Sequence, residues 1–345
     1  MARRLEHRGA EEVNARPRAI VAMNPPALAE NLFGPHRARL NDLVDVSAEV
    51  ITEFDGDLAS HLMADVEILL AGWGCPHIDH DLLDRMPGLR AVVFAGGTAS
   101  SILDTVEATR RGIVFTNAGE GNAQAVAEYT AATILLAGKR AKYAEQIYRE
   151  GRAFVDREAD LIDSGNFGRT VGLVGASRIG RRVAQLLQPT DLRVLIYDPY
   201  ASEEEIVSLG GLKVELDDLL ATSDIVSLHA PATPETEHML AARELAMMRD
   251  GAVLINTARG SLIDHDALRR HLRTGRLDAI LDVTEPEPLA ADDELWTLPN
   301  VTLTPHIAGA TGNELHRLGR DVVDEVARYI AGDAFVGFER VPGVV

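Results

Sequence analysis

The chain has 345 residues, of which 46% are hydrophobic and 25% charged, and this length is sufficient for two domains with separate cores. Its formal net charge of −19 argues against nucleic acids and anionic membranes as partners, because both require a basic surface. A single cysteine, Cys75, excludes an internal disulfide framework and favours a cytoplasmic protein, and no apolar stretch is long enough to span a bilayer.

The first part of the chain alternates apolar runs with helix-like stretches, which is typical of parallel strands covered by helices. Residues 1–18 come before this pattern and have no apolar core, so we expect a loose extension and neither a signal peptide nor an anchor. The strand predicted at 91–94 leads into the small-residue loop 95–101, at the carboxyl end where open α/β sheets bind ligands. A plain connecting turn is the alternative interpretation of this loop. The other predicted elements are strands at 19–23, 68–71 and 114–116 and helices at 79–86 and 102–111.

A long helix is predicted from Asn122 to about Glu150, and its length suits a connector between domains. The segment Arg152 to Arg169 has mixed polarity and is predicted to be an arm that lies on a neighbouring molecule. A second series of strands and helices follows, and it makes a full doubly wound unit. Its predicted strands lie at residues 171–174, 194–197, 225–228, 253–255, 279–283 and 301–303.

The last predicted helix, residues 313–331, follows the strands of this second series. At this position the chain could return to the first domain and complete it. We therefore expect a discontinuous substrate domain of residues 19–121 and 311–345, with a nucleotide-binding domain of residues 122–310 inserted into it. Both are expected to be doubly wound α/β domains with parallel sheets. The inserted domain is expected to be of the Rossmann type and the outer one flavodoxin-like.

The stretch Val171 to Gly180 predicts a strand, a tight turn and the start of a helix. Its spacing Gly175-x-Ser177-x-x-Gly180 is a variant of the glycine-rich fingerprint that brings a helix N-terminus to a pyrophosphate. Gly175 is expected to make the turn, and Gly180 to let the helix and strand pack closely. Ser177 departs from the pattern, because a second glycine there lets the backbone approach the phosphates.

Asp198 ends the next apolar run, 18 residues after Gly180. An acid at this place accepts hydrogen bonds from the adenosine ribose hydroxyls and repels a 2′-phosphate. Residues 201–205 contain no Arg or Lys that could bind such a phosphate. The predicted cofactor is therefore NAD rather than NADP.

Three polar residues, Arg259, Glu287 and His306, each follow an apolar run that is predicted to be a buried strand. They should therefore project from the sheet edge that carries the fingerprint turn. A guanidinium can bind a carboxylate or polarise a carbonyl, and an imidazole beside a carboxylate can pass a proton near neutral pH. Together the three suit the reduction of a 2-oxo acid by NADH. Singly, they have plainer interpretations as a surface cation, a loop acid and a structural histidine.

Five sequence runs together resemble the successive motifs of the D-isomer-specific 2-hydroxyacid dehydrogenases. They occur in the order of that family and cover the predicted cofactor domain from end to end. In the first domain the match is looser and rests on residues 91–101 and 126–128. The five runs are Gly-Ala-Ser-Arg-Ile-Gly at 175–180, Ser-Leu-His-Ala-Pro at 227–231, Asn-Thr-Ala-Arg-Gly at 256–260, Asp-Val-Thr-Glu-Pro-Glu-Pro at 282–288 and Thr-Pro-His-Ile-Ala-Gly at 304–309.

The resemblance implies that His306 is the acid/base, that Glu287 is its partner and that Arg259 orients the substrate. Glu287 is preferred to Glu285 because it stands at the family's offset of five from Asp282, which is implied to lie near the nicotinamide amide. Backbone N–H groups of the loop residues Gly97, Thr98 and Ala99 are implied to bind the substrate carboxylate, and no metal is implied. The implied cofactor contacts are Gly175, Ser177, Arg178, Ile179, Asp198, His229, Ala230, Pro231, Thr257, Asp282 and Gly309.

The resemblance also implies a homodimer in which the arm at 152–169 embraces the partner's cofactor domain. Ser101 stands where the family has an acid, so the family does not identify the hydroxy acid. Formate dehydrogenases of the superfamily are less similar, since they have glutamine at the place of Glu287. The chain ends about 14 residues after its last predicted helix, so we expect no appended regulatory domain of the kind some phosphoglycerate dehydrogenases carry.

A binding protein that senses NADH on the same fold is the alternative to an enzyme. The C-terminal-binding corepressors, which resemble this family, fill the same three catalytic positions. The triad therefore does not discriminate between the two functions, whereas a panel of 2-oxo acids with NADH would.

Overall fold

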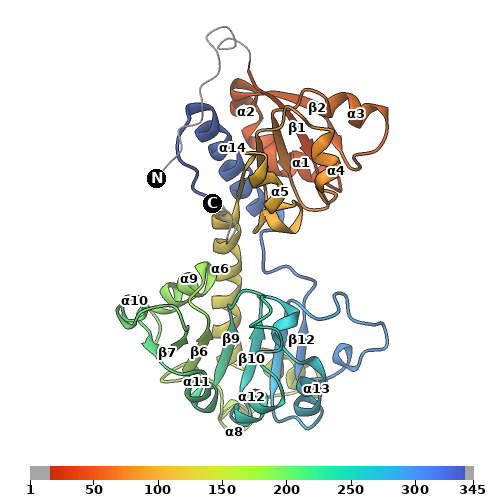
Figure 1. The fold of residues 1–345 in the computed structure, drawn as a ribbon. Helices are drawn as coiled ribbons and strands as arrows, with labels where there is room; N and C mark the ends of the chain where they lie inside the picture. Colours follow the sequence, from red (N-terminus) through yellow and green to blue (C-terminus); the bar gives the residue numbers. More distant parts are fainter. Residues whose placement is uncertain (1–15, 339–345) are drawn as a thin grey trace. The chain divides into compact units, whose positions relative to one another are not determined.

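The computed structural model describes residues 16–338, and these fall into two compact units (Figure 1). The first unit takes in the described residues up to Asn122 and those from Ala310 onward, and the second spans Ala123–Gly309. The domain limits expected from the sequence lie one residue away. The loose extension expected at residues 1–18 lies outside the described residues except for its last three, and the first strand begins at Arg18. No helix within residues 16–338 is long and apolar enough to cross a membrane.

The first unit is built on five parallel strands in the order β2-β1-β3-β4-β5, which is the flavodoxin-like order. Helix α14 returns from the far end of the sequence and packs against α1 of this unit. The two helices approach closely, because a Cβ at Gly319 would lie 1.7 Å from the carbonyl oxygen of Leu32. The strands are β1 (Arg18–Ala22), β2 (Asp45–Ile51), β3 (Ile68–Ala71), β4 (Ala91–Phe94) and β5 (Val114–Asn117). The helices are α1 (Ala27–Phe33), α2 (Arg37–Leu43), α3 (Asp57–Met63), α4 (His80–Asp84), α5 (Thr105–Arg110) and α14 (Leu315–Ala331).

The second unit has seven parallel strands in the order β12-β11-β10-β9-β6-β7-β8. This is the Rossmann order with one further strand, so the expected fold class is confirmed for both units. The strands are β6 (Thr170–Val174), β7 (Arg193–Tyr197), β8 (Leu212–Lys213), β9 (Ile225–Leu228), β10 (Val253–Asn256), β11 (Asp278–Leu281) and β12 (Val301–Leu303). The helices are α6 (Gly119–Gly138), which begins within the first unit, and α7 (Ala141–Gly151), α8 (Arg157–Asp160), α9 (Arg178–Leu187), α10 (Glu203–Ser208), α11 (Leu216–Thr222), α12 (Ala242–Met247) and α13 (His265–Arg273).

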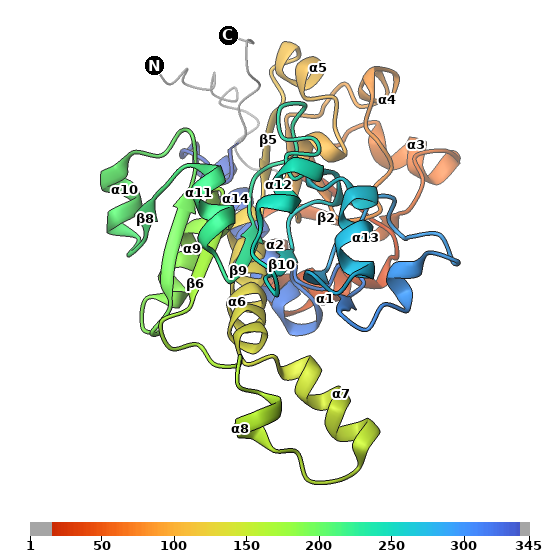
Figure 2. The same cartoon turned by 90° about the horizontal axis from the view of Figure 1, so that it is seen from below.

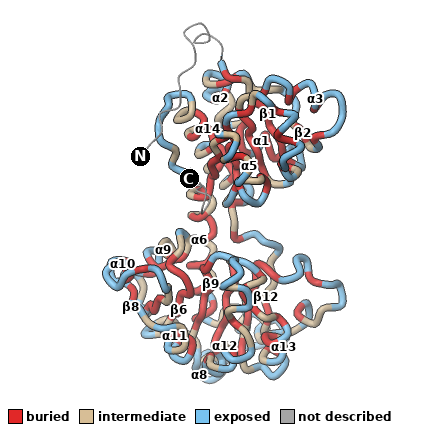
Figure 3. Tube along the Cα trace, viewed as in Figure 1, coloured by how far each residue is buried: buried red, intermediate tan, exposed pale blue. Residues whose placement is uncertain are grey.

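Most strands are buried along their length, and the outer faces of the helices are exposed (Figure 3). This burial explains why short apolar runs located most strands from the sequence. Several helices begin directly after an aspartate, because the aspartate side chain accepts a hydrogen bond from a backbone N–H group of the first turn. Asp79 caps α4 in this way and Asp104 caps α5. Both helices therefore start later than the apolar pattern predicted.

Two strands and the long connecting helix also differ from expectation. The sequence analysis missed β2 and β8, because both lie at sheet edges and are largely exposed, so neither forms a continuous apolar run. The helix expected to run from Asn122 to about Glu150 is two helices. It breaks after Gly138, where Arg140 adopts left-handed backbone angles (φ 51°).

The break starts an arm, defined as residues 139–164, that is longer than the expected segment 152–169. The arm leaves and returns at one place, because the N–H of Gly165 donates to the carbonyl of Gly138 at 2.7 Å. The side chain of Asn166 holds the same place by donating to Leu135 at 3.0 Å. Figure 2 shows most of α7 and α8, the helices of the arm, extending away from the second sheet, while Lys142 at the start of α7 donates to the carbonyl of Val301 in β12.

Candidate active site

The fingerprint turn lies between β6 and α9 and is packed tightly on its neighbours. Gly175 has a φ of +107°, a backbone conformation that disfavours residues with a side chain. A Cβ there would also lie 2.8 Å from the backbone nitrogen of Ala230. A Cβ at Gly180 would lie 2.1 Å from the carbonyl oxygen of Gly175. Both glycines are therefore required by the turn and by helix packing, as expected from the fingerprint.

Ser177 is the N-cap of α9 and needs no glycine-like backbone. Its φ of −63° suits any residue, and its Oγ accepts a hydrogen bond from the N–H of Gly180 at 3.3 Å. Arg178 and Ile179 are the first two residues of the helix, where backbone N–H groups point out of the helix end. Helix N-termini of this kind attract phosphate. The serine thus caps a helix that still presents its positive end.

Asp198 follows β7 and is bound directly to the fingerprint turn. Its Oδ2 accepts the N–H of Ala176 at 2.7 Å, and its Oδ1 accepts those of Tyr200 at 2.8 Å and Ala201 at 2.9 Å. Burial raises the pKa of Asp198, but these three donors outweigh that effect and the pKa is held below its usual range. A fixed negative charge beside the phosphate-binding turn fits the adenosine ribose of NAD.

Arg181 braces the same turn, and the sequence analysis assigned it no role. Its Nε donates to the carbonyl of Ala176 at 2.7 Å, and its Nη1 lies 3.3 Å from Glu205 Oε1. The turn, the helix N-terminus and the acid at the end of β7 together fit a dinucleotide.

The structure brings Glu287 and His306 together in the second unit. His306 Nδ1 lies 2.7 Å from Glu287 Oε1, and both side chains are about half exposed. Glu287 belongs to the loop after β11 and His306 to the loop after β12, and these strands are neighbours in the sheet. Among the described residues, Glu285 makes no hydrogen bond or ion pair with His306. The pair leaves Nε2 of the imidazole facing away from the carboxylate.

Asp282 holds the His306 loop in place. This carboxylate is 2% exposed, and its Oδ1 accepts the hydroxyl of Thr304 at 2.6 Å and the N–H of Ile307 at 2.9 Å. Its Oδ2 accepts the N–H of Ala308 at 2.8 Å. His306 itself has a φ of 55°, in the left-handed region that non-glycine residues rarely adopt. The expected contact of Asp282 with the nicotinamide amide stays a prediction, and the structure adds this role within the loop.

Arg259 lies just after β10, on an exposed turn. Its Nη1 donates to the carbonyl of Ala258 at 2.6 Å, and it makes no hydrogen bond or ion pair with His306 or Glu287 in the described structure. The buried side chain of Asn256 shapes the turn, because its Nδ2 donates to the carbonyl of Arg259 at 2.8 Å and its Oδ1 accepts the N–H of Ala258 at 3.0 Å. The sequence analysis did not single out Asn256, although an asparagine at the end of an apolar strand is a signal that could have identified this residue.

The other predicted cofactor residues lie on loops of the second unit. His229 is buried, with Nε2 3.0 Å from Ser227 Oγ, and burial lowers its pKa to about 3. Thr257 is also buried, and its hydroxyl is 2.8 Å from that of Thr130 on α6. Ala230 packs against Gly175, Pro231 is exposed, and Gly309 is the last residue of the unit.

The small-residue loop belongs to the first unit and follows β4. Thr98 is exposed and Ala99 is buried, and Ser101 Oγ donates to the carbonyl of Thr98 at 2.7 Å. Gly96 is packed, because a Cβ there would lie 2.4 Å from the Phe94 ring. Beside Gly97 there is open space, because a Cβ there would meet nothing within 4 Å apart from its chain neighbours. Packing therefore explains Gly96, and a ligand could approach the backbone at Gly97.

Comparisons with known proteins show which family the chain is similar to. Residues 131–308 match the family model described as "D-isomer specific 2-hydroxyacid dehydrogenase, NAD binding domain". The chain is 36% identical over 259 residues to a glyoxylate reductase of Korarchaeum cryptofilum, covering 74% of this chain and 77% of that protein. It is 34% identical over 307 residues to a D-3-phosphoglycerate dehydrogenase of Mycobacterium tuberculosis, covering 89% of this chain but 57% of that protein.

A solved structure is also similar along most of the chain. The D-lactate dehydrogenase of Aquifex aeolicus, complexed with NAD and lactic acid, superposes with a TM-score of 0.74 at 29% identity. The match covers 94% of this chain and all of that one. This chain spans about half the length of the curated phosphoglycerate dehydrogenases that it matches. The cofactor predicted from the fingerprint and Asp198, NAD, is confirmed.

Proposed function

This chain belongs to the D-isomer-specific 2-hydroxyacid dehydrogenase family, and we propose that it interconverts a 2-oxo acid and a D-2-hydroxy acid with NAD(H). The observation that carries the proposal is the hydrogen-bonded pair of His306 and Glu287. It lies on loops at the carboxyl ends of the strands, the same edge of the sheet that carries the fingerprint turn. Open α/β sheets bind their ligands at this edge.

Bound NADH supplies the hydride that reduces the carbonyl carbon of the 2-oxo acid. The carbonyl oxygen gains negative charge at that moment, so it must receive a proton from a nearby acid. We assign this proton to Nε2 of His306, because Nδ1 is held by Glu287 at 2.7 Å. The carboxylate fixes the orientation of the ring and stabilises its positive charge. The products are the 2-hydroxy acid and NAD⁺, and the reverse reaction returns the proton to His306.

Arg259 and the loop at 95–101 are proposed to bind the substrate. A guanidinium offers paired N–H groups to a carboxylate or carbonyl oxygen, and Arg259 stands exposed on a turn that Asn256 holds. Backbone N–H groups at Gly97, Thr98 and Ala99 are proposed to bind the substrate carboxylate. The open space at Gly97 supports this assignment.

A panel of 2-oxo acids, followed by the loss of NADH absorbance, tests the activity. His306→Gln should lower kcat by about 10²-fold to 10⁴-fold without changing the affinity for NADH, because only proton transfer is lost. Glu287→Gln should also lower kcat, whereas the matched variant Glu285→Gln should not. Arg259→Ala should raise KM and lower kcat together. Absence of NADH oxidation with every acid of the panel would favour the NADH-sensing alternative, and a dependence on Glu285 instead of Glu287 would show that the wrong acid is assigned.

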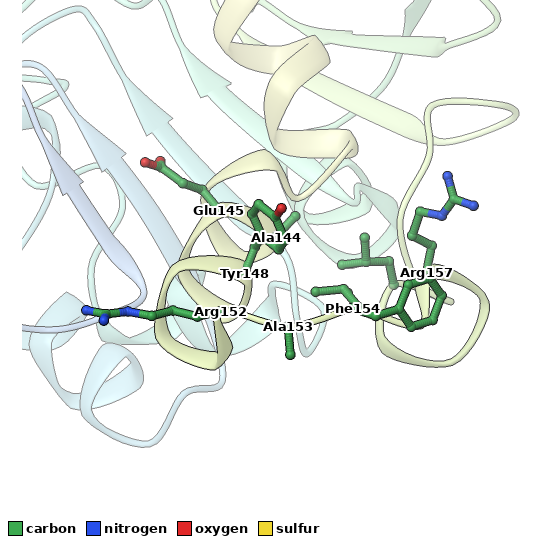
Figure 4. A pocket seen from close by; sticks show the side chains of 9 residues that line it. Ala144, Glu145, Tyr148, Arg152, Ala153, Phe154 and Arg157 are labelled. Carbon is green, nitrogen blue, oxygen red and sulfur yellow. The ribbon is translucent and has the colours of Figure 1, made fainter.

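We also propose that the protein is a homodimer formed through the arm at residues 139–164. Large apolar side chains of the arm are exposed to solvent, with Phe154 86% exposed and Ile162 77% exposed. Side chains from α7, α8 and the loop between them surround an open hollow of about 710 Å³ (Figure 4). The arm also exposes Tyr148 (63%), and several exposed apolar side chains along one segment are typical of a protein interface. The proposed occupant is the second unit of another copy of this chain.

The oligomeric state tests this interface. Light scattering at micromolar concentration should give twice the mass of one chain, and the double variant Phe154→Asp/Ile162→Asp should give a monomer. Val207→Asp is the matched control, because Val207 on α10 is 57% exposed but lies outside the arm. A monomeric parent protein, or a control that dissociates equally, would contradict the proposal.

A further inference from the structure

Helix α6 carries two consecutive hydroxyl residues, Tyr129 and Thr130, that contact two different loops of the second unit. The hydroxyl of Tyr129 lies 3.2 Å from the Oγ1 atom of Thr304, in the loop after β12. The hydroxyl of Thr130 lies 2.8 Å from that of Thr257, in the turn after β10. A single helix therefore contacts two of the loops that carry the proposed catalytic side chains.

The contact of Tyr129 continues as a chain of hydrogen bonds to the residues beside His306. Thr304 donates its only hydroxyl hydrogen to Asp282 at 2.6 Å, so Tyr129 is the donor in the contact between the two hydroxyls. The same oxygen of Asp282 accepts the N–H of Ile307 at 2.9 Å. Since His306 lies between Thr304 and Ile307 in the chain, the tyrosine hydroxyl holds the loop that carries the imidazole.

The contact of Thr130 is buried on both sides. Thr130 is 0% exposed and Thr257 6%, so removal of either hydroxyl leaves the other without this partner at a place that water does not reach. Thr257 lies in the turn that the side chain of Asn256 closes. Its Nδ2 donates to the carbonyl of Arg259, and its Oδ1 accepts the N–H of Ala258. A shift of Thr257 therefore moves the backbone of Arg259 with it.

Helix α6 is itself fixed on the second sheet around these two residues. Ala127, Ala131 and Ile134 are buried in an apolar cluster that also contains Val171 of β6 and Ile255 of β10. Their spacing of four and three residues places them on one face of the helix. The helix therefore gives the two hydroxyls a support that is anchored in the core of the unit.

From this arrangement we infer that α6 sets the positions of His306 and Arg259 relative to each other, with Tyr129 and Thr130 as the positioning residues. The inference rests on the proposed function, because it concerns the same two side chains. Strands β10 and β12 are separated in the sheet by β11 and so lie roughly 10 Å apart. A displacement of about 1 Å in a reacting group can cost about 10²-fold in rate. The two hydroxyls act on the reaction through the loops that they hold.

Removal of each hydroxyl should give a different kinetic change. Tyr129→Phe should lower kcat about tenfold with little change in the KM of the 2-oxo acid, because the loop of the proton donor is loosened. Thr130→Val should raise KM and lower kcat together, as a displaced Arg259 would. Thr130→Ser keeps the hydroxyl and should restore most of both values. The rates are measured at saturating NADH, so that a changed cofactor affinity does not enter.

Two matched variants control for the loss of a hydroxyl as such. Thr133 lies one turn further along α6, and its hydroxyl donates at 2.8 Å to the carbonyl of Tyr129 within the same helix. In the first unit, the hydroxyl of Tyr329 donates to Glu67 at 2.9 Å. Thr133→Val and Tyr329→Phe should both keep kcat and KM within about twofold of the parent protein. Kinetic changes in these controls equal to those of the α6 variants would overturn the inference.

Amide hydrogen exchange, followed by NMR, tests the two contacts without any catalysis. In Tyr129→Phe the N–H of Ile307 should exchange at least about tenfold faster than in the parent protein, because its loop is loosened. In Thr130→Val the N–H of Ala258 should exchange faster in the same way. Thr133→Val should leave both exchange rates unchanged.

Failure of this inference differs from failure of the proposed function. If the parent protein reduces 2-oxo acids, but Tyr129→Phe and Thr130→Val keep its kinetics and its exchange rates, the inference is wrong and the dehydrogenase stands. If no 2-oxo acid is reduced, the proposed function fails, and the exchange rates alone decide whether α6 holds the two loops. If Thr130→Val does not fold, Tyr129→Phe at its partly buried position still decides.

Discussion

Replacing Asp282 by asparagine tests how the acid/base histidine is held. The carboxylate is buried and accepts three hydrogen bonds, from Thr304, Ile307 and Ala308. These three residues flank His306 in the sequence. An amide of the same size has one oxygen and one NH₂ group. If its oxygen keeps the bonds to Thr304 and Ile307, its NH₂ faces the N–H of Ala308, and two donors then meet where a bond existed.

The expected cost follows from these three bonds. A buried N–H without an acceptor costs about 1–3 kcal/mol. The two remaining bonds lose their charge, and charge-assisted bonds are about twice as strong as neutral ones, so each loses roughly 1 kcal/mol. The native loop is then weakened by roughly 3–5 kcal/mol. A left-handed backbone conformation costs a non-glycine residue about 1–2 kcal/mol. A loop conformation in which His306 no longer has its φ of 55° is therefore favoured by that amount.

Each 1.4 kcal/mol is a factor of ten in a population, so Asp282→Asn should lower kcat by about 10²-fold or more. The assay is steady-state reduction of the best 2-oxo acid, with NADH affinity measured by fluorescence and stability by urea unfolding. Asp264→Asn is the control, because Asp264 caps α13 through the N–H of Ala267 and asparagine caps a helix equally well. A kcat within threefold of the parent would refute the positioning role, and a loss confined to NADH affinity would leave Asp282 as a cofactor residue alone.

Three further predictions concern charged and buried groups. NADH should be preferred to NADPH by about tenfold to a hundredfold, and Asp198→Ala should narrow the difference, because the carboxylate repels a 2′-phosphate; equal kcat/KM for both cofactors in the parent protein would contradict this. Burial lowers the pKa of His229 to about 3, whereas in the unfolded chain it is about 6.5. Between these pH values the unfolded state binds a proton that the folded state does not, so the free energy of unfolding should decrease as the pH is lowered, by about 2 kcal/mol at pH 5. Urea unfolding at pH 5 and 7 should show a smaller loss of stability for His229→Gln than for the parent protein, and an equal loss in the variant would contradict this prediction. Burial raises the pKa of the Cys75 thiol to about 12, so a thiol reagent should label Cys75 only after unfolding, and rapid labelling of the native protein would show that the thiol is accessible.

The sequence by itself determined most of the strands, all but β2 and β8 of those described, and the edge at which the chemistry lies. Runs such as 68–71 and 91–94 are apolar at successive positions because both faces of a parallel sheet are buried. Residues that follow such runs must emerge at one edge, which is why Arg259, Glu287 and His306 were identified without a structure. Ser177 was identified as well, but its role as an N-cap, a local pattern readable from sequence, was overlooked.

Only the tertiary structure decided what lies beside what. The bonds from Asp282 to Ile307 and Ala308 join residues 25 and 26 positions apart, and they exist because β11 and β12 are neighbours in the sheet. The contact of His306 with Glu287 depends on the same adjacency, whereas the choice of Glu287 over Glu285 had already been made from the sequence. The break after Gly138 occurs where the returning end of the arm packs on α6 through Gly165 and Asn166. Local patterns record burial and capping, whereas contacts between distant loops depend on strand order, which no single segment of the sequence contains.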